Sequence, residues 1–195
     1  MSNSASGISD EDVALMIENA TLRAEISGLR ARIRDLQALA DADPVLPLAN
    51  RRAFEADLAR RICQVRDAGV SAALIFIDVN GLKAINDGLG HAAGDALLHH
   101  VATILNDHAR PGDMAARIGG DEMALLLGRA NPLLVTVKAE LIARTVAARP
   151  VSFGKTTMPA RIAIGTALVR ADDTPASLIA RADAAMYARK GIGRR

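Results

Sequence analysis

Residues 114–127 read Met-Ala-Ala-Arg-Ile-Gly-Gly-Asp-Glu-Met-Ala-Leu-Leu-Leu, and this stretch decides the fold. Its two apolar runs, 114–118 and 123–127, predict two short strands. Between them stands Gly119-Gly120-Asp121-Glu122, and a Gly-Gly pair makes a tight turn easy because glycine accepts positive φ at little cost. The stretch therefore predicts a short β-hairpin with two carboxylates at its tip.

Apolar patterning on either side of this hairpin predicts the rest of an α+β domain. Residues 72–78 predict a buried strand, and 81–90 predict a polar turn with a short helix. Residues 151–169 predict one or two strands around 154–157. Four longer segments have helical periodicity: 50–68, 94–108, 131–148 and 174–190. From residue 72 on the order is βααββαβ, and we expect a mixed, largely antiparallel sheet with helices packed on it.

A different pattern precedes this domain. Residues 1–10 are rich in Ser, Asn, Gly and Asp, and we expect them to be flexible. Over 11–42, leucines recur every seven residues and a second set follows four residues after each: Leu15, Leu22, Leu29, Leu36 and Asn19, Ile26, Ile33, Ala40. Leucine at d and isoleucine at a of a heptad favour a parallel two-stranded coiled coil, in which Asn19 at an a position specifies the register.

Charges beside the heptad support a homodimer through residues 11–42. Glu18 and Glu25 take g positions, and Arg23 and Arg30 take the e positions that follow them. In a parallel dimer each glutamate faces an arginine of the other chain. The alternative is a single amphipathic helix that lies on the core of its own chain, although core-facing helices carry a wider apolar stripe. Asp41-Ala-Asp-Pro44 is expected to end the helix, so the domain runs from 43 to 195.

The composition of the 195 residues excludes several classes of protein. Aromatic residues make up 2%, which argues against stacking platforms for RNA bases, and the net charge of +2 does not suit a general nucleic-acid binder. Cys63 is the only cysteine, so the chain can form neither an internal disulfide nor a cysteine-based zinc site. The apolar run 72–77 falls far short of the roughly 20 residues that span a bilayer. We therefore expect a cytoplasmic protein with neither nucleic-acid nor membrane partners.

Three acidic residues stand at the ends of apolar strands. Asp78 closes the strand 72–78, and Asp121 and Glu122 lie in the hairpin turn. If the first strand lies beside the hairpin, these carboxylates converge at one edge of the sheet. Converging oxygen ligands suit Mg²⁺ or Mn²⁺ that carries substrate phosphates, and Gly119 and Gly120 let a bulky ligand approach the backbone. The alternative is an ordinary hairpin whose acids are solvated.

Four motifs in order join these acids into a larger pattern: Asp78-Val-Asn-Gly-Leu-Lys83-Ala-Ile-Asn86-Asp87, Gly90-His-Ala-Ala-Gly94-Asp95, Arg117-Ile-Gly-Gly-Asp-Glu-Met123 and Tyr187-Ala-Arg-Lys190-Gly-Ile-Gly193-Arg194. The set resembles the GGDEF domain of diguanylate cyclases, from about residue 43 to 194. The resemblance implies a palm-like nucleotidyl cyclase fold with a ferredoxin-like order of elements. It implies a reaction that joins two GTP into cyclic di-GMP and releases pyrophosphate. It also implies one GTP per domain, so that two domains must face each other.

The resemblance assigns the metal site and the reacting groups. It implies that Asp78 and the carbonyl of Val79 bind Mg²⁺ or Mn²⁺. It places Asp121 and Glu122 at the metals and the reacting 3′-hydroxyl, and it leaves open which of the two is the metal ligand and which the base. Lys83 is counted with these catalytic residues because it adds positive charge where the phosphates collect.

The resemblance also assigns the residues that bind GTP. Asn86 and Asp95 resemble the guanine-binding pair, since a carboxylate accepts from guanine N–H groups and an amide donates to its acceptors. Lys83, Lys190 and Arg194 resemble contacts to the phosphates. Without the spacing Tyr-x-x-Lys-x-x-Gly-Arg, the last two would be a solvated basic tail. Gly119 and Gly120 complete the expected substrate site.

Arg110-Pro-Gly-Asp113 indicates a second site. In the family, an Arg-x-x-Asp pair placed five residues before the hairpin motif is the site of product inhibition, and here residues 114–118 separate Asp113 from Gly119. Arginine binds a guanine edge or a phosphate in bidentate fashion, and aspartate accepts from guanine. The resemblance therefore implies inhibition by cyclic di-GMP at Arg110 and Asp113. The alternative is a Pro-Gly surface loop with incidental charges.

Several positions depart from the family pattern. Met123 replaces the Phe after Gly-Gly-Asp-Glu, and Asn80 replaces the second Asp after the first strand. Leu82 replaces the usual Phe before the Lys, and Leu46-Pro47 replaces Thr-Gly where the domain begins. Methionine is an adaptable apolar substitute, so we expect Met123 to pack inward. The departures favour an alternative function, a catalytically silent domain that binds GTP or cyclic di-GMP as a signalling effector. A pure dimerisation module is a third interpretation.

Overall fold

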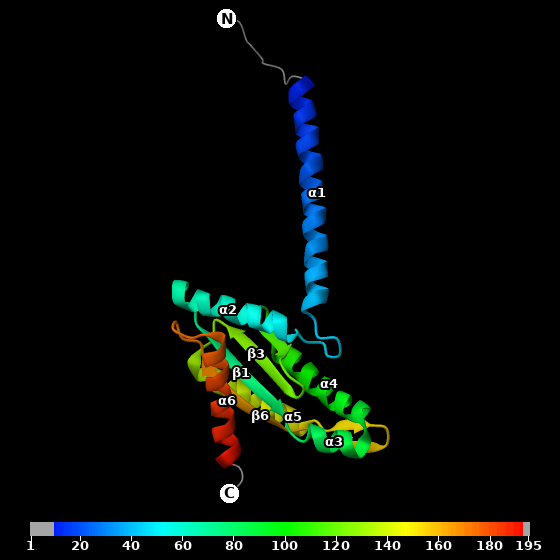
Figure 1. Cartoon of the computed structure of the whole chain (residues 1–195), viewed down its shortest axis with the longest axis vertical. Coiled ribbons are helices and arrows are strands. Elements are labelled where there is room, and N and C mark those ends of the chain that lie inside the picture. Colours follow the sequence, from blue (N-terminus) through cyan, green and yellow to red (C-terminus); the bar gives the residue numbers. More distant parts are fainter. Residues whose placement is uncertain (1–9, 193–195) are drawn as a thin grey trace, which may run out of the picture. The chain divides into compact units, whose positions relative to one another are not determined.

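The computed structural model of the chain describes residues 10–192, without the side chains at 12, 34 and 190–192 (Figure 1). The segment expected to be flexible lies outside the described residues except for Asp10. Arg194 lies outside them as well. The chain divides into two compact units, Met1–Ala40 and Asp41–Arg195.

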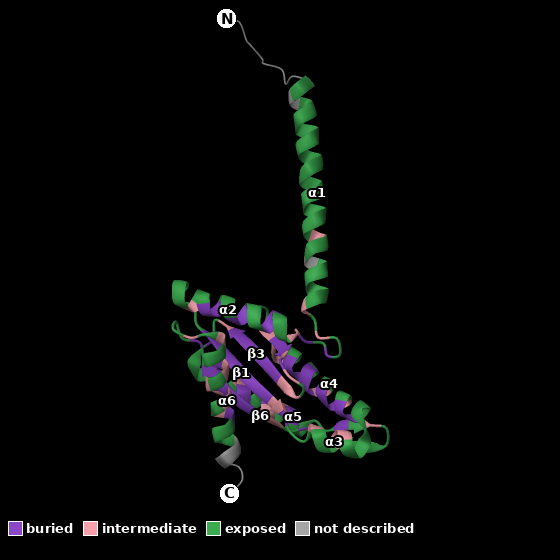
Figure 2. Ribbon diagram, in the orientation of Figure 1, coloured by how far each residue is buried: buried purple, intermediate pink, exposed green. Residues whose placement is uncertain are grey.

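The described residues of the first unit lie on one helix, α1 (Asp10–Asp41). The helix was expected over 11–42. The heptad leucines on it, at positions 15, 22, 29 and 36, are between 49% and 66% exposed (Figure 2). Among the described residues, no helix is long and apolar enough to cross a membrane.

The second unit contains the remaining elements in the expected order. They are α2 (Arg51–Ala68), β1 (Ala72–Val79), α3 (Leu82–Leu89), α4 (His91–His108), β2 (Met114–Arg117), β3 (Glu122–Gly128), α5 (Pro132–Ala148), β4 (Val151–Phe153), β5 (Thr156–Met158), β6 (Ile162–Leu168) and α6 (Pro175–Ile192). The sequence predicts one or two strands over 151–169, and the structure has three. β4 and β5 are short and pair only with each other, so they form a hairpin of their own beside the βααββαβ unit.

The main sheet has the strand order β2-β3-β1-β6. Every pairing in it is antiparallel, so the expectation of a mixed sheet is wrong for the described strands. A parallel contact remains as an isolated bridge between Ala49 and Ala116. Whether two strands run parallel or antiparallel depends on the end of the sheet at which the connecting segment brings the chain back. This is decided by tertiary packing and not by local sequence. The α+β fold with an antiparallel sheet is otherwise confirmed.

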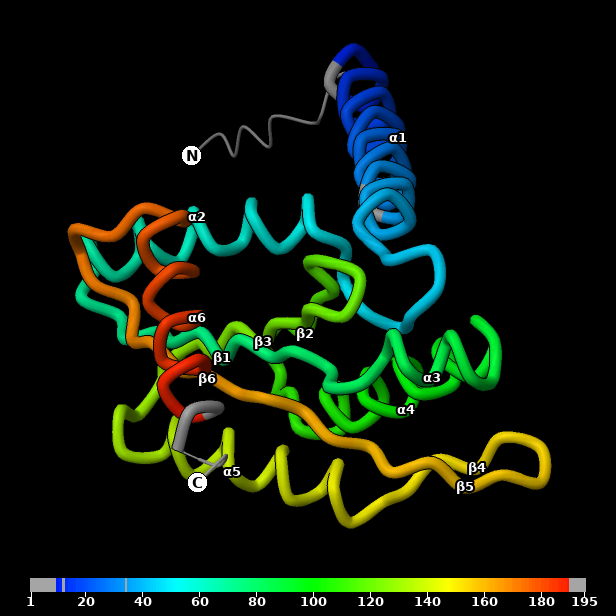
Figure 3. The backbone as a smooth tube through the Cα atoms, turned by 60° about the horizontal axis from the view of Figure 1, so that its bottom comes forward, coloured from blue at the N-terminus to red at the C-terminus, as the bar shows by residue number. Residues whose placement is uncertain are grey.

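Helices cover both faces of this sheet (Figure 3). One buried cluster lies between the sheet and α4 and α5, and the other lies between the sheet and α2 and α6. Along β1, Ile75 and Ile77 belong to the first cluster, whereas Leu74 and Phe76 belong to the second. Side chains alternate between the two faces along a strand, so Asp78, two residues after Phe76, lies on the same face as Phe76. The acid at the end of β1 therefore lies on the α2 and α6 side.

Candidate functional site

The acids that the sequence places at strand ends meet where β1 and β3 pair. Asp78 lies directly opposite Glu122 in the register, so the two side chains share the face that is covered by α2 and α6. Asp121 lies in the turn before β3 begins, where strand alternation does not constrain its side chain. The Val79 N–H donates to the Asp121 carbonyl at 2.9 Å and holds this turn against the end of β1.

Negative charge accumulates around Glu122. Burial raises the pKa of Glu122 above its usual value, the charges of Asp121, Asp78 and Asp183 raise it further, and Arg51 opposes them. Asp183, from α6, is an acid that the sequence reasoning missed. A cavity of about 590 Å³ opens on this face and includes Glu122, Arg51 and Asp183 in its lining. A bound cation would relieve the repulsion among these carboxylates.

The oxygen atoms at this end of the sheet suit a metal ion that also binds the phosphates of a substrate. Within residues 10–192, no three His, Cys, Asp or Glu side chains lie close enough together to hold an ion alone. Mg²⁺ usually binds to one or two carboxylates and completes its shell with water and substrate phosphates. Asp78 and Glu122 could supply the carboxylates, and the carbonyl of Val79 could supply a further oxygen at the end of the same strand.

Arg117 holds the hairpin turn in shape. Its Nε donates to the Gly119 carbonyl at 3.1 Å, and its Nη2 donates to the Gly120 carbonyl at 2.8 Å. Its Nη1 lies 3.7 Å from Oδ1 of Asp43, a residue of the segment that leads into α2. The sequence reasoning did not assign these roles to Arg117 or Asp43. An arginine two residues before a Gly-Gly turn was the available signal.

The expected guanine-binding residues lie where α3 packs against α4. Asn86 is half-buried on α3, and among the described side chains its Oδ1 is a buried acceptor without a hydrogen-bond partner. A Cβ at Gly94 of α4 would collide with this oxygen, so the Asn86 side chain can take this position only because residue 94 is glycine. Asp95 follows Gly94 and is exposed. An unpaired buried acceptor beside an exposed carboxylate suits a ligand that donates hydrogen bonds.

The expected phosphate contacts are only partly described. Lys83 is exposed near the start of α3, two residues after Gly81. Lys190 lies on α6, but its side chain is not among those described. Arg194 lies outside the described residues. The structure therefore describes one of the three basic side chains. It lies on α3, the helix that follows the strand end carrying Asp78.

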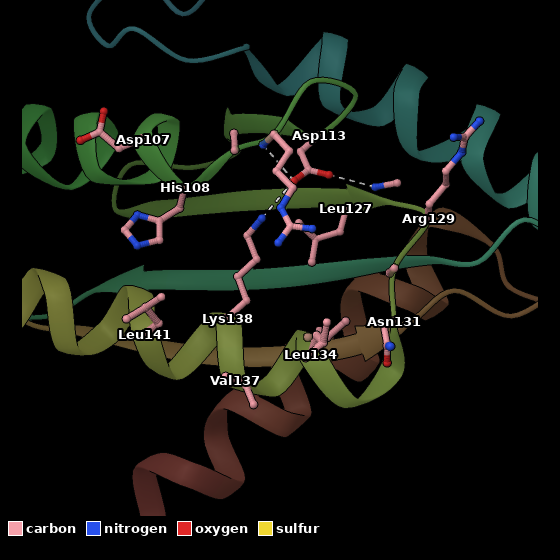
Figure 4. A pocket seen from close by; sticks show the side chains of 15 residues that line it. Asp107, His108, Asp113, Leu127, Arg129, Asn131, Leu134, Val137, Lys138 and Leu141 are labelled. Carbon is pink, nitrogen blue, oxygen red and sulfur yellow. Dashed lines mark hydrogen bonds and ion pairs between the residues drawn. The ribbon is translucent and has the colours of Figure 1, made fainter.

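The Arg110–Asp113 turn borders a separate cavity of about 440 Å³ (Figure 4). Arg110 is exposed, whereas the Asp113 side chain is 6% exposed. Asp113 accepts from the N–H groups of Arg110 and Gly128, at 3.1 Å each, and from Lys138 Nζ at 3.0 Å. Lys138 comes from α5, 25 residues further along the chain, and was not expected in this site. Leu134, on the same helix, lines the cavity.

Comparisons with known proteins identify the family of the chain. The family described as "Diguanylate cyclase, GGDEF domain" matches residues 40–195. The chain is 37% identical over 175 residues to the diguanylate cyclase TpbB of Pseudomonas aeruginosa, a match that covers 85% of this chain and 40% of TpbB. It is 35% identical over 175 residues to the probable diguanylate cyclase DgcE of Escherichia coli, covering 87% of this chain and 16% of DgcE. The chain thus spans less than half the length of these relatives.

Solved structures have the same fold. The crystal structure of the coiled coil and GGDEF domain of DgcB from Caulobacter crescentus, in complex with c-di-GMP, superposes with a TM-score of 0.78 at 30% identity and covers 93% of this chain and 96% of that one. The diguanylate cyclase SiaD of Pseudomonas aeruginosa, in complex with its activator SiaC, gives 0.79 at 29% identity and covers 94% of this chain and 72% of that one. The chain therefore belongs to the GGDEF-domain family of diguanylate cyclases.

Proposed function

We propose that the protein is a diguanylate cyclase, which condenses two GTP into cyclic di-GMP and releases pyrophosphate. The observation that carries the proposal is the register of β1 and β3, which sets Asp78 opposite Glu122 beside the turn of Asp121. The named relatives, diguanylate cyclases at 35–37% identity over most of the chain, support the same activity.

Each residue of the site then has a chemical task. Asn86 and Asp95 hold the guanine, and Lys83 contacts the phosphates together with Lys190 and Arg194. We assign Glu122 to the metal with Asp78, because the two share one face of the sheet. We assign Asp121, which lies in the turn, to the proton of the 3′-hydroxyl. When bound, Mg²⁺ neutralises the charge on the phosphates.

Catalysis on this scheme is mainly positioning and electrostatics. The 3′-oxygen of one GTP attacks the α-phosphorus of the other, the new phosphodiester forms, and the bond to pyrophosphate breaks. The proton of the hydroxyl passes to the carboxylate at the hairpin tip. A second, equivalent attack closes the ring. Because each domain holds one GTP, two domains must face each other for either step.

We propose that the two domains come from a homodimer joined by α1. The heptad leucines of α1 are exposed in the single chain, which leaves them available to a second copy. The relative DgcB, whose crystallised fragment consists of a coiled coil and a GGDEF domain, has the same order of parts. Glu18 and Glu25 would then face Arg23 and Arg30 of the other chain.

We further propose that cyclic di-GMP binds at Arg110 and Asp113 and inhibits the enzyme. The cavity beside this turn has both charged and apolar walls, with Lys138 and Leu134 contributed by α5. A cyclic dinucleotide carries two phosphates and two purines, so cations and apolar side chains together suit it. The DgcB relative was crystallised with c-di-GMP.

The test is incubation of the full chain with GTP and Mg²⁺, followed by detection of pyrophosphate and cyclic di-GMP. Asp78→Ala should lower turnover by at least about 100-fold, because it removes a hard metal ligand. Asp172→Ala, at an exposed position after β6, is the matched control and should match the wild type. Cyclic di-GMP formation by the Asp78→Ala protein at the wild-type rate would contradict the assignment.

The alternative, a silent domain that only binds nucleotide, rests on the departures at 80, 123 and 46–47. Met123 is fully buried, and Leu46 is 3% exposed in the cluster beneath α4. Met123 and Leu46 therefore pack on the α4 and α5 side of the sheet, away from the face of Asp78 and Glu122, which favours the enzyme. Pro47 is exposed. GTP binding without any pyrophosphate release in the same assay would favour the silent domain instead.

A further inference from the structure

Helix α2 carries a buried ion pair that no part of the proposed catalytic scheme uses. Counted over the whole residue, Asp57 is 4% exposed and Arg61 is 8% exposed, and both rank among the buried residues of the part of the chain that the structure describes. Arg61 Nε donates to Asp57 Oδ2 at 2.6 Å, and Arg60 reaches the other oxygen of Asp57 from the exposed side. Burying two charges costs desolvation energy that the pairing offsets only in part, so such a pair is weak evidence for stability alone.

The second contact of Arg61 points to what the pair does. Its Nη2 donates to the carbonyl of Gly112 at 2.8 Å, across 51 residues of sequence. Gly112 has a φ of +92°, a backbone conformation that glycine adopts readily, and it lies inside the Arg110–Asp113 turn. A Cβ at Gly128 would lie 2.8 Å from Arg61 Nη1 and 3.3 Å from the Gly112 carbonyl oxygen, so the absence of a side chain there leaves room for this contact.

The backbone of the turn determines where its two functional side chains lie. The Asp113 N–H donates to the Arg110 carbonyl at 2.8 Å and closes the turn, while the Asp113 side chain is held by Gly128 and Lys138. Rotation of the Gly112 peptide would change the path between Arg110 and Asp113. It would also leave the buried guanidinium of Arg61 short of an acceptor, which costs more than an ordinary hydrogen bond.

We propose that Arg61, oriented by Asp57, is a positioning residue for the cyclic di-GMP site: it fixes the Gly112 carbonyl from beneath and so holds Arg110 and Asp113 in the arrangement that binds product. The inference rests on the proposed product site. Arg61 contacts the turn through the Gly112 carbonyl and is not one of the residues that line the cavity. Arg61 contributes preorganisation. A turn that samples several conformations binds cyclic di-GMP with an affinity reduced in proportion to the fraction of molecules in the binding-competent conformation.

The experiment replaces the ion pair by an apolar pair in the full-length protein. Asp57→Leu with Arg61→Leu removes the donor to Gly112 without leaving an unpaired buried charge, so folding should persist. Binding of cyclic di-GMP and of a non-hydrolysable GTP analogue is measured by titration calorimetry on the same samples. We expect the dissociation constant for cyclic di-GMP to rise about tenfold relative to that for the GTP analogue, as for a turn competent about a tenth of the time.

Two single variants sharpen the result. Arg61→Lys keeps a positive charge beside Asp57 but lacks the planar fork that reaches both Asp57 and Gly112, so its affinity for cyclic di-GMP should fall between those of the wild type and the double variant. This variant also serves if the double variant does not fold. Arg66→Ala removes an exposed arginine of the same helix, which pairs with its neighbour Asp67, and should bind like the wild type.

The titrations distinguish a failure of the role of Arg61 from a failure of the product site. Equal affinity of the wild type and the double variant for cyclic di-GMP would overturn the role of Arg61 while leaving the product site in place. A parallel loss of affinity for both ligands would show that α2 supports the whole domain and would also overturn it. If the wild type itself does not bind cyclic di-GMP, the proposed product site fails and the inference fails with it.

Discussion

At the scale of single residues, the carboxylates at the hairpin tip work against the stability of the protein. Glu122 is half-buried, and its strand neighbour across the ladder is another acid, Asp78. Like charges directly opposite in a sheet are destabilising. An arrangement that disfavours the empty protein and favours a bound cation is what a metal-dependent site requires.

The Glu122 carboxyl makes stability depend on pH. Its pKa is raised in the folded protein, so between the unfolded value of about 4.3 and the folded value the native state binds more protons than the unfolded chain. Stability therefore falls as pH rises through that window. Glu122→Gln should raise the melting temperature by about 1–3 °C at neutral pH, and the difference should vanish below about pH 4.

This prediction is tested by thermal unfolding of both proteins across pH in metal-free buffer. Glu140→Gln, at an exposed position of α5, is the matched control and should follow the wild type at every pH. A Glu122→Gln protein that melts below the wild type at neutral pH would show that the carboxylate is stabilising, contrary to the argument.

Gly94 is the second residue with a specific consequence. Its missing Cβ leaves room for the Asn86 side chain, so Gly94→Ala should displace the proposed guanine-binding amide. We expect the KM for GTP to rise at least about tenfold, because the displaced amide no longer lies where the guanine would bind. Gly88→Ala on α3, where a Cβ would meet nothing within 4 Å, is the control. Equal GTP saturation curves for the two alanine variants would contradict the steric argument.

At the scale of elements, the turn of the hairpin β2–β3 is held in shape by an arginine of β2 itself and by one acid from outside the hairpin. The Ile118 N–H donates to the Glu122 carbonyl at 2.9 Å, which closes the turn, and Arg117 holds the two glycine carbonyls. Asp43 connects this clamp to the segment that leads into α2, since its Oδ1 also accepts from the Leu46 N–H at 2.8 Å. The beginning of the domain and the hairpin thus stabilise each other.

Arg117→Lys tests the clamp. Lysine keeps the positive charge but cannot donate to Gly119 and Gly120 at once in the planar geometry of a guanidinium. We expect turnover to fall about 10–100-fold, because the carboxylates at the tip lose their position, as misplacement by about 1 Å does in other sites. The measurement is kcat with saturating GTP and Mg²⁺, beside Arg161→Lys at an exposed position before β6. Wild-type turnover by the Arg117→Lys protein would show that the backbone alone shapes the turn.

At the scale of the whole molecule, the two units divide the proposed work. The unit Asp41–Arg195 carries every residue assigned to GTP, metal and product, whereas the helix before it carries only the heptad. A reaction between two half-sites depends on the concentration of one beside the other. A coiled coil makes that encounter intramolecular.

A chain that starts at Asp41 should therefore be monomeric at micromolar concentration. Its rate per molecule should increase with protein concentration, whereas that of the full chain should stay constant. Linkage of this kind raises the overall avidity by about 10²–10⁴-fold. Sedimentation velocity and turnover over a dilution series measure both effects. A full chain that sediments as a monomer at micromolar concentration would contradict the coiled-coil dimer.

The sequence by itself determined the local elements and the positions of the acids along them. The Gly-Gly turn, the apolar strands around it and the helical periodicities are local signals, and the structure has the hairpin and helices near the expected positions. Met123 was expected to pack inward, and it is fully buried. These predictions succeed because turn propensity and apolar periodicity act over a few residues. The convergence of Asp78 with Asp121 and Glu122 was expected only if the first strand lies beside the hairpin, and no local signal decides that.

Only the tertiary structure decided how distant segments meet. It set Asp78 opposite Glu122, made the whole main sheet antiparallel, and brought Lys138 to Asp113 and Arg61 to Gly112. Nothing near position 61 or 138 marks those side chains, because a surface arginine or lysine on a helix has the same local pattern whether or not a turn packs against it. Such partners follow from the packing of helices on both faces of one sheet, and this packing is a property of the complete chain.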